Sequence, residues 1–248
     1  MKRGGQPDIE ISHGRCLLES GAEDVWGWST PAGQARVAAR VRWIIETCGL
    51  GPNAKVLECG CGTGMFTREF AKTGASITAV DISTDLLDEA RKLCPAQNVN
   101  FVQTNLEDPR ELPDAFFDVV CGVSVLHHLV LPESLVALKG KMRSGARFAF
   151  SEPNLLNPIN KYFIFVPDLE KRRRRGASPS EMAFYPEEIR TIFVEAGFEV
   201  LKLEHRDFLH PLVPGMLIKP FKIVQAIAEH FPFLRKWSGS LWLSGVIP

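Results

Sequence analysis

Three glycines at alternating positions give the chain its clearest chemical feature. They follow a short apolar run that ends in an acid, Val56-Leu57-Glu58-Cys59-Gly60-Cys61-Gly62-Thr63-Gly64. Glycines between a strand and a helix permit positive φ and let a ligand approach the bare backbone. A dinucleotide fingerprint would need glycine where the chain has Met65, and no phosphate-binding Lys-Ser/Thr pair follows. The loop therefore predicts a ligand site that is neither a dinucleotide site nor a P-loop.

Two acids are expected beside this loop. Asp81 ends the second apolar run of the chain, and a carboxylate at that place accepts hydrogen bonds from ribose hydroxyls. Glu58 ends the first run and places a second negative charge near the site. The pair favours a ligand that carries positive charge over a diphosphate.

Short apolar runs alternate with helical patterns through residues 53–153, as expected of the elements that position these side chains. The runs are 55–58, 77–81, 99–102, 117–121 and 147–151, and two later ones are 199–203 and 241–247. This alternation is typical of βαβ units in a parallel sheet covered on both faces. We predict an α/β fold with a doubly wound, mostly parallel seven-stranded sheet, a helical N-terminal cap and C-terminal lid insertions.

The whole chain is interpreted as a single domain. Residues 1–52 would form the cap, 53–153 the cofactor-binding core, and 154–248 a substrate lid with the last two strands. In the cap, residues 35–45 have apolar positions on one helical face and arginines on another. All five tryptophans lie outside 53–153. They either enclose an organic substrate or fill helix–sheet contacts.

Composition excludes several classes of protein. The 29 basic and 29 acidic residues cancel, which argues against a protein that coats nucleic acid by bulk charge. The six cysteines form no CxxC pair, as expected of reduced thiols in a cytoplasmic chain. No signal peptide and no apolar run long enough for a spanning helix is present in the sequence. We expect a cytoplasmic protein.

Taken together, the motifs resemble those of class I S-adenosylmethionine-dependent methyltransferases over about residues 53–153. Residues 56–64 are similar to the first motif of that family and 80–83 to the second. Residues 102–108 are similar to the third motif, and the stretch from 117 to 129 to the fourth. The resemblance implies a Rossmann-like fold, S-adenosyl-L-methionine as cofactor and S-adenosyl-L-homocysteine as product.

The same resemblance assigns the cofactor contacts. In that family the glycine loop packs against the methionine moiety, the acid at Asp81 holds both ribose hydroxyls, and residues at Asn105 and Leu106 lie by the adenine. Asn105 departs from the usual aspartate, although its carbonyl oxygen can still accept from the adenine amino group. The implied cofactor-binding residues are Glu58, Gly60, Cys61, Gly62, Gly64, Asp81, Ile82, Asn105, Leu106 and Val123.

Three side chains are candidates for acting on the acceptor. His127 and His128 follow the fourth strand, where an imidazole can take a proton from a hydroxyl, phenol or amine. The alternative is that this pair only begins a helix. Glu152 follows the fifth strand, where it orients a substrate amine or hydroxyl or is simply a solvated acid. Cys59 and Cys61 are interpreted as loop fillers, and we expect no metal site.

Further features, most of them in the C-terminal region, indicate which class of acceptor is methylated. No Asn/Asp-Pro-Pro-Tyr follows the fourth strand, which disfavours methylation of DNA amino groups. The basic run 171–175 either binds phosphate groups of RNA, lipid or substrate, or is a solvated loop. Residues 218–231 form an amphipathic helical pattern. With neighbours up to 242, they either rest on a membrane surface or pack on the sheet as a lid.

We therefore predict an S-adenosylmethionine-dependent methyltransferase of biosynthesis that acts on a small or lipid-like organic acceptor, at oxygen, nitrogen or carbon. Three alternatives stay open. The first is an RNA methyltransferase that uses the run 171–175. The second is an enzyme of the same fold that uses the sulfonium for another reaction, such as cyclisation. The third is a non-catalytic partner subunit.

Overall fold

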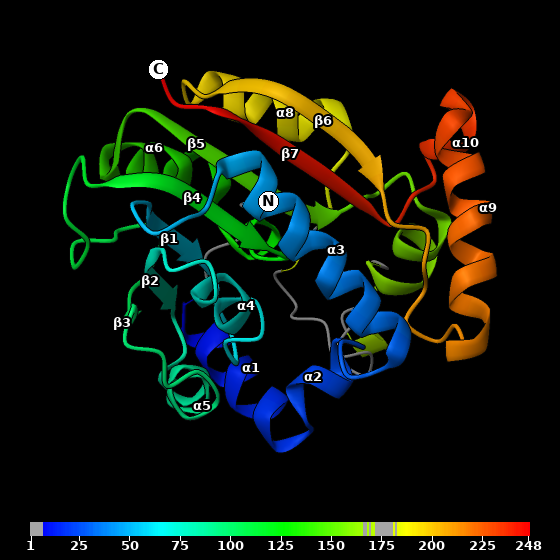
Figure 1. Ribbon diagram of the computed structural model, residues 1–248, viewed down its shortest axis with the longest axis horizontal. Helices are drawn as coiled ribbons and strands as arrows, with labels where there is room; N and C mark the ends of the chain where they lie inside the picture. Colours follow the sequence, from blue (N-terminus) through cyan, green and yellow to red (C-terminus); the bar gives the residue numbers. More distant parts are fainter. Residues whose placement is uncertain (1–6, 166–167, 169, 172–180, 182) are drawn as a thin grey trace.

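Seven strands form one sheet in the computed structural model, which describes residues 7–165, 168, 170–171, 181 and 183–248 (Figure 1). The strand order is β3-β2-β1-β4-β5-β7-β6, and β7 runs antiparallel to β5 and to β6. The strands are β1 Lys55–Cys59, β2 Ser76–Asp81, β3 Val99–Gln103, β4 Phe117–Val123, β5 Met142–Pro153, β6 Glu199–Arg206 and β7 Ser240–Val246. The predicted mostly parallel seven-stranded sheet is confirmed.

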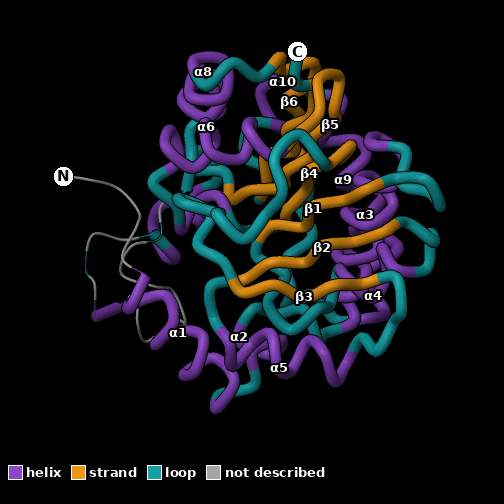
Figure 2. The backbone as a smooth tube through the Cα atoms, turned by 90° about the vertical axis from the view of Figure 1, so that its left-hand side faces the viewer, coloured by secondary structure: helices purple, strands orange, loops and turns teal. Residues whose placement is uncertain are grey.

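Helices cover both faces of this sheet (Figure 2). One face packs on α3 Pro31–Cys48, α4 Thr67–Ala71 and α5 Thr84–Leu93, through an apolar cluster that includes Ile44, Phe70 and Leu87. The opposite face packs on α6 Leu131–Lys141 and α8 Pro186–Glu195, through a cluster that includes Leu135 and Phe193. Strands buried on two sides require apolar residues on both faces, which explains their nearly continuous apolar runs.

The remaining elements surround the carboxyl edge of the sheet or extend from it. They are α1 Pro7–Glu19, α2 Ala22–Val25, the 3-10 helix η1 Leu126–His128, the π-helix η2 Asn160–Ile164, the 3-10 helix η3 Gly215–Leu217, α9 Ile218–His230 and α10 Pro232–Arg235. Among the described helices, none is long and apolar enough to cross a membrane.

Helix α3 corrects one detail of the sequence interpretation. It begins after Thr30, whose hydroxyl accepts from the Gly33 amide at 2.9 Å, and it ends at Cys48, before Gly49. Arg40 does not lie on a separate polar face, because its side chain is 2% exposed between the buried Val37 and Ile44. The spacing 37, 40, 44 is that of one helical face, so Arg40 breaks the apolar stripe.

Strand order brings the predicted motifs to one place. Strand β1 lies between β2 and β4 and runs parallel to both. The loops after these three strands therefore emerge side by side at the carboxyl edge, where parallel α/β sheets bind their ligands. This edge receives the glycine loop after β1, Asp81 after β2 and the histidine pair after β4.

Candidate functional site

A cavity of about 900 Å³ opens at this carboxyl edge. Its wall includes the glycine loop, the ends of β2 and β4, helices α1 and α2, the π-helix η2 and residues 207–212. We call the side formed by the glycine loop and Asp81 the cofactor end, and the side formed by the histidine pair, η2 and 207–212 the acceptor end. Ligand cavities span about 300–1,000 Å³, so this cavity lies at the upper end of that range.

The glycine loop approaches its surroundings closely. Gly60 has φ +62°, and a Cβ atom there would overlap a methyl carbon of Val125. Any larger residue at that position is excluded by the backbone conformation and by the neighbour. The Cys61 amide donates to the Val80 carbonyl at 3.0 Å, which fixes the loop to the end of β2.

Asp81 joins the loop to the helix that follows β2. Its Oδ2 accepts from the Gly62 amide and its Oδ1 from the Ser83 amide, each at 2.9 Å. Burial raises the pKa of Asp81, and these two amide donors oppose that shift. Each carboxylate oxygen keeps a lone pair that can accept from a ligand hydroxyl.

Most of the expected cofactor contacts lie on the cavity wall. The wall includes Gly60, Cys61, Gly62, Asp81, Ile82, Asn105, Leu106 and Val123. Asn105 already uses its carbonyl oxygen to accept from the Glu107 amide at 3.0 Å. That oxygen has a second lone pair for a ligand amino group. Gly64 and Glu58 do not line the cavity.

Glu58 differs from the expectation of a second negative charge. It is 3% exposed, and its Oε2 accepts no hydrogen bond from the described residues. Burial raises the pKa of Glu58 to about 8, and the nearby Asp81 adds to the shift. Glu58 is therefore mostly uncharged at neutral pH in the ligand-free protein, because a buried carboxylate with few donors is costly.

At the acceptor end, His127 is held from behind by Glu152. The His127 Nδ1 lies 2.7 Å from Oε2 of Glu152, while Oε1 accepts from the Val125 and Leu126 amides at 3.0 and 2.9 Å. A carboxylate partner places the proton of the neutral ring on Nδ1, so Nε2 carries the lone pair. His127 lines the cavity whereas Glu152, 1% exposed, does not. Glu152 is thus in place to orient His127 and not to touch a ligand.

His128 has different surroundings. Its ring stacks on that of His127 with centroids 4.3 Å apart. Its Nδ1 lies 2.9 Å from Oε2 of Glu10, and its Nε2 lies 3.7 Å from Oε1 of Glu181. Although burial alone would lower the pKa of His128, the two carboxylates raise it to about 9. His128 is therefore a cation at neutral pH and cannot accept a proton there.

Sequence reasoning did not connect Glu10 or Glu181 with this site. Glu10 lies on α1, which packs against α5. Gly14 allows that approach, since a Cβ there would lie 2.6 Å from the Ser83 hydroxyl oxygen. No motif marks these acids, because they lie 118 and 53 positions from His128 along the chain.

One group of side chains has the spacing of a metal site. His127, His128 and Glu181 each offer one ligand atom, and the three atoms lie within 4.8 Å of one another. These side chains also have partners within the protein, since His127 pairs with Glu152 and His128 with Glu10 and Glu181. The His128 cation offsets part of the negative charge of Glu10 and Glu181, and a metal ion bound to His128 would have to displace its proton.

A buried ion pair forms another part of the wall that the sequence interpretation missed. Arg40 Nη2 lies 2.6 Å from Oδ2 of Asp207, and Arg36 Nε lies 2.8 Å from the same oxygen. Although burial opposes it, the two arginines lower the pKa of Asp207. The guanidinium of Arg36 lies over the Trp28 ring at 4.7 Å. The available signal was an arginine within the apolar stripe of α3.

Two expectations about the tail have different outcomes. Residues 172–175 of the basic run lie outside the described part of the chain. The predicted amphipathic helix is present as α9, but none of its residues is buried and none lines the cavity. The part of the tail that does line the cavity is η2 with residues 207–212 and 239–240.

Comparison with known proteins gives three findings. A family model described as a methyltransferase domain matches residues 57–150. The ubiquinone biosynthesis O-methyltransferase of Pseudomonas aeruginosa is 32% identical over 167 residues, which cover 65% of this chain and 71% of that protein. An uncharacterized protein of Synechococcus sp. is 35% identical over 127 residues, but the chain spans only 28% of its length.

Solved structures agree on the fold. An S-adenosylmethionine-dependent methyltransferase of Thermotoga maritima, described as a possible histamine N-methyltransferase, superimposes with a TM-score of 0.68 at 16% identity. The match covers 97% of this chain and all of the other.

Proposed function

The chain belongs to the class I S-adenosylmethionine-dependent methyltransferases, and on that premise we propose that it methylates a hydroxyl oxygen of a lipid-like organic acceptor. S-Adenosylmethionine is its cofactor. Held by the glycine loop and Asp81, it would supply the methyl group, and the electrons of the broken carbon–sulfur bond would stay with sulfur in S-adenosylhomocysteine. The acceptor hydroxyl oxygen would form the new bond to the methyl carbon, and His127 would take the hydroxyl proton.

The pairing of His127 with Glu152 is the observation that carries this proposal. A phenol has a pKa near 10 and needs a base near neutrality to attack efficiently. Held at Nδ1 by a buried carboxylate at 2.7 Å, His127 offers Nε2 as that base. In this proposal His128 contributes a positive charge and Glu152 positions His127, so only one of the three predicted side chains takes the proton.

Cofactor contacts are the second part of the proposal. Asp81 would accept from both ribose hydroxyls, and Asn105 with Leu106 would contact the adenine. The glycine loop would pack against the methionine moiety. The position of these residues around one end of the same cavity supports the assignment.

The chemistry of the acceptor end supports a lipid-like molecule. Its wall includes the apolar side chains Phe163, Phe165, Phe208, Leu209 and Leu212. The P. aeruginosa relative is named as an O-methyltransferase of ubiquinone biosynthesis. Phenols with an isoprenoid substituent are therefore the first acceptors to examine.

A panel of matched acceptors tests the proposal. The protein would be incubated with S-adenosylmethionine carrying a labelled methyl group and an alkyl phenol, the matching aniline or the matching methyl ether. We expect label in the phenol product, with an equal amount of S-adenosylhomocysteine. Label only in the aniline would overturn the oxygen assignment.

The same panel separates the remaining alternatives. A product of unchanged mass without S-adenosylhomocysteine would indicate cyclisation. Labelled RNA with unlabelled phenols would identify RNA as the acceptor. Either result would contradict methylation of a lipid-like hydroxyl acceptor.

A further inference from the structure

We propose that the outer face of α9 and α10 docks on an anionic lipid membrane and that the acceptor enters the cavity from that membrane. This inference rests on the proposed lipid-like acceptor. We define the outer apolar surface as the exposed side chains Leu212, Met216, Leu217, Ile223, Val224, Ile227, Phe231, Phe233 and Trp237.

This surface concentrates the exposed apolar residues of the protein. Of the 18 large apolar side chains that are exposed in the described chain, nine lie within residues 212–237. Scattered apolar side chains are normal on a protein surface, whereas a contiguous group marks a contact with another body. In Figure 1 these helices stand at the margin of the molecule, beside the end of the sheet.

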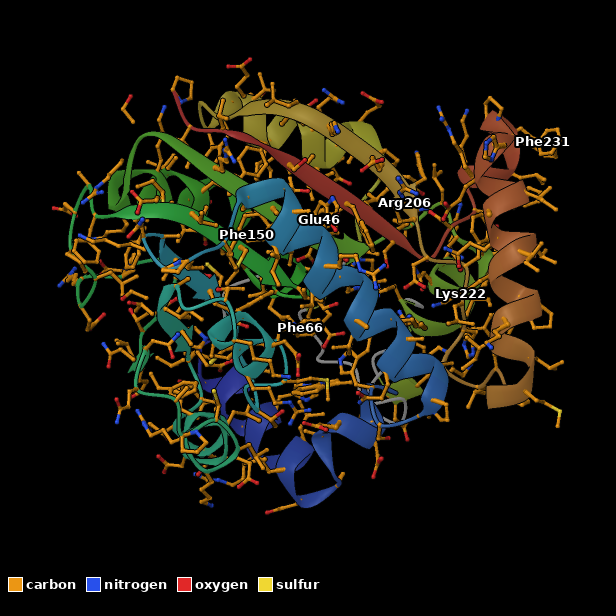
Figure 3. The ribbon with its side chains drawn as sticks, viewed as in Figure 1. Glu46, Phe66, Phe150, Arg206, Lys222 and Phe231 are labelled. Carbon is orange, nitrogen blue, oxygen red and sulfur yellow. The ribbon has the colours of Figure 1, made fainter. Side chains whose placement is uncertain are left out.

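Helix α9 exposes the apolar residues that a helix packed on the core would bury. Ile223, Ile227 and Phe231 are four residues apart, share one face, and are 65%, 56% and 53% exposed. The half-buried side of the helix is mixed: it includes Phe221 and Ala228, and there Glu229 accepts from Arg206 at 3.0 Å and from Gln225 at 2.9 Å. Figure 3 shows Arg206 on the side of the sheet and Phe231 at the outer margin. Amphipathic helices bury their apolar face, so this one needs an apolar phase outside the chain.

The charges around the surface select an anionic occupant. Residues 212–237 contain Lys219, Lys222, Arg235 and Lys236. The acid in the segment is Glu229, which is paired with Arg206. A second copy related by twofold symmetry would bring lysines against lysines with no acid opposite them. Anionic lipid headgroups would pair with these basic side chains, and the boundary between headgroups and acyl chains would bury the apolar ones.

A shallow groove of about 480 Å³ on α9 can accommodate part of a lipid. It is lined by Ile223, Ala226, Ile227 and Phe231, with Lys222 and His230. An acyl chain fits against the apolar walls while Lys222 meets the headgroup phosphate.

The outer apolar surface is continuous with the mouth of the cavity. Leu212 is 80% exposed and also lines the cavity. Phe163 also lines the cavity and is 57% exposed. Just before η2, the Asn157 side-chain amide donates to the carbonyl of Trp237, two residues after α10, at 2.6 Å. An acceptor with a hydrocarbon chain can therefore pass from the bilayer along Leu212 into the acceptor end.

Vesicle sedimentation of the full chain tests the docking. The vesicles would be phosphatidylcholine alone or phosphatidylcholine with about one third phosphatidylglycerol, since only the second carries negative charge. We expect binding to the anionic vesicles. Ile223→Ser together with Ile227→Ser should reduce it about tenfold for each residue, because each loses the burial of an apolar side chain. Lys219→Gln with Lys222→Gln should reduce it about fivefold for each charge.

The control variant is Val194→Ser with Leu201→Ser, which changes two side chains of similar exposure outside the segment, at 55% and 58%. This variant should bind vesicles like the wild type. Equal loss in the control, or no vesicle binding by the wild type, would overturn the docking. So would a concentration-dependent dimer that the isoleucine variant converts to monomers, because a second copy would then cover the surface.

Activity on a short, water-soluble phenol keeps this test separate from the proposed function. The isoleucine variant should methylate that phenol at the wild-type rate and lose activity only on a long-chain phenol held in vesicles. Vesicle binding without methylation of any phenol would overturn the hydroxyl acceptor and leave the docking standing. Equal loss on both phenols would contradict delivery of the acceptor from the membrane.

Discussion

The two ends of the cavity are built in different ways. At the cofactor end the interacting groups are close in sequence, as in the bond from the Gly62 amide to Asp81, 19 residues later. At the acceptor end they are remote, as in the Arg40–Asp207 pair, 167 residues apart, and the contact between Glu10 and His128. A site made from loops after neighbouring strands depends on local backbone geometry. A site made from remote segments depends on how those segments pack together in the folded chain. The cofactor end should therefore tolerate substitutions in the C-terminal region, whereas the acceptor end should not.

The largest effect is expected for Asp81→Ala at the cofactor end. Hydrogen bonds to a charged group contribute about 1.5–3 kcal/mol each, so losing two ribose contacts should weaken S-adenosylmethionine binding about a thousandfold. Calorimetric titration measures this affinity. Asp85→Ala, a neighbouring acid that pairs with Arg15 on the surface, is the control and should bind normally. Unchanged affinity in the Asp81 variant would show that Asp81 does not bind the ribose of S-adenosylmethionine.

His127→Gln should separate the two ends most clearly. General base catalysis contributes about a hundredfold or more, so we expect kcat to fall by that factor while the affinity for S-adenosylmethionine is kept. Steady-state kinetics with a phenol and calorimetry with the cofactor give the two values. His230→Gln changes an exposed histidine of α9 and is the control. A variant with normal kcat would show that the acceptor loses its proton elsewhere.

Glu58→Gln should change the pH dependence of stability. The pKa of Glu58 is about 8 in the folded protein against an ordinary 4.5. The folded state thus keeps a proton that the unfolded state releases, and wild-type stability falls as pH rises from about 4.5 to about 8. Above that range the variant should be more stable by on the order of 2 kcal/mol.

Urea unfolding of the ligand-free protein across this range measures the difference. The exposed Glu46→Gln is the control and should follow the wild type. Parallel curves for the wild type and the Glu58 variant would mean that Glu58 is ionised in the folded state.

The smallest effect is expected for His128→Gln at the acceptor end. The pKa of His128 rises from 6.5 to about 9 on folding. Its stabilising contribution is complete below pH 6.5 and disappears as pH rises through about 9. We expect the wild type to be more stable than the variant by about 1 kcal/mol at pH 6, since the ion pairs are partly solvated.

Thermal unfolding at three pH values gives this difference. It should vanish above the raised pKa of His128. A difference that stays constant with pH would show that packing of the ring, and not its charge, stabilises the contact with Glu10 and Glu181.

Much of the fold followed from sequence because its signals are local. Each strand was recognised from a short apolar run, and the observed bounds differ mainly at the ends. Strand β5 begins at Met142 and not near Arg147. It includes Gly145, whose φ of +80° interrupts the apolar pattern that marks a strand in the sequence. The histidine pair was recognised as a candidate, but its two members could not be told apart. Their difference lies in partners on other segments.

The sheet, the glycine loop and Asp81 could be predicted from local sequence, since strand periodicity and glycine conformation are properties of adjacent residues. The three-dimensional structure was needed to show that Glu152 is placed to orient His127, that Glu10 and Glu181 raise the pKa of His128, and that Arg40 is buried against Asp207. It also decided that α9 turns its apolar face outward. Burial and distant charges set these properties, and both exist only once remote segments of the chain have come together.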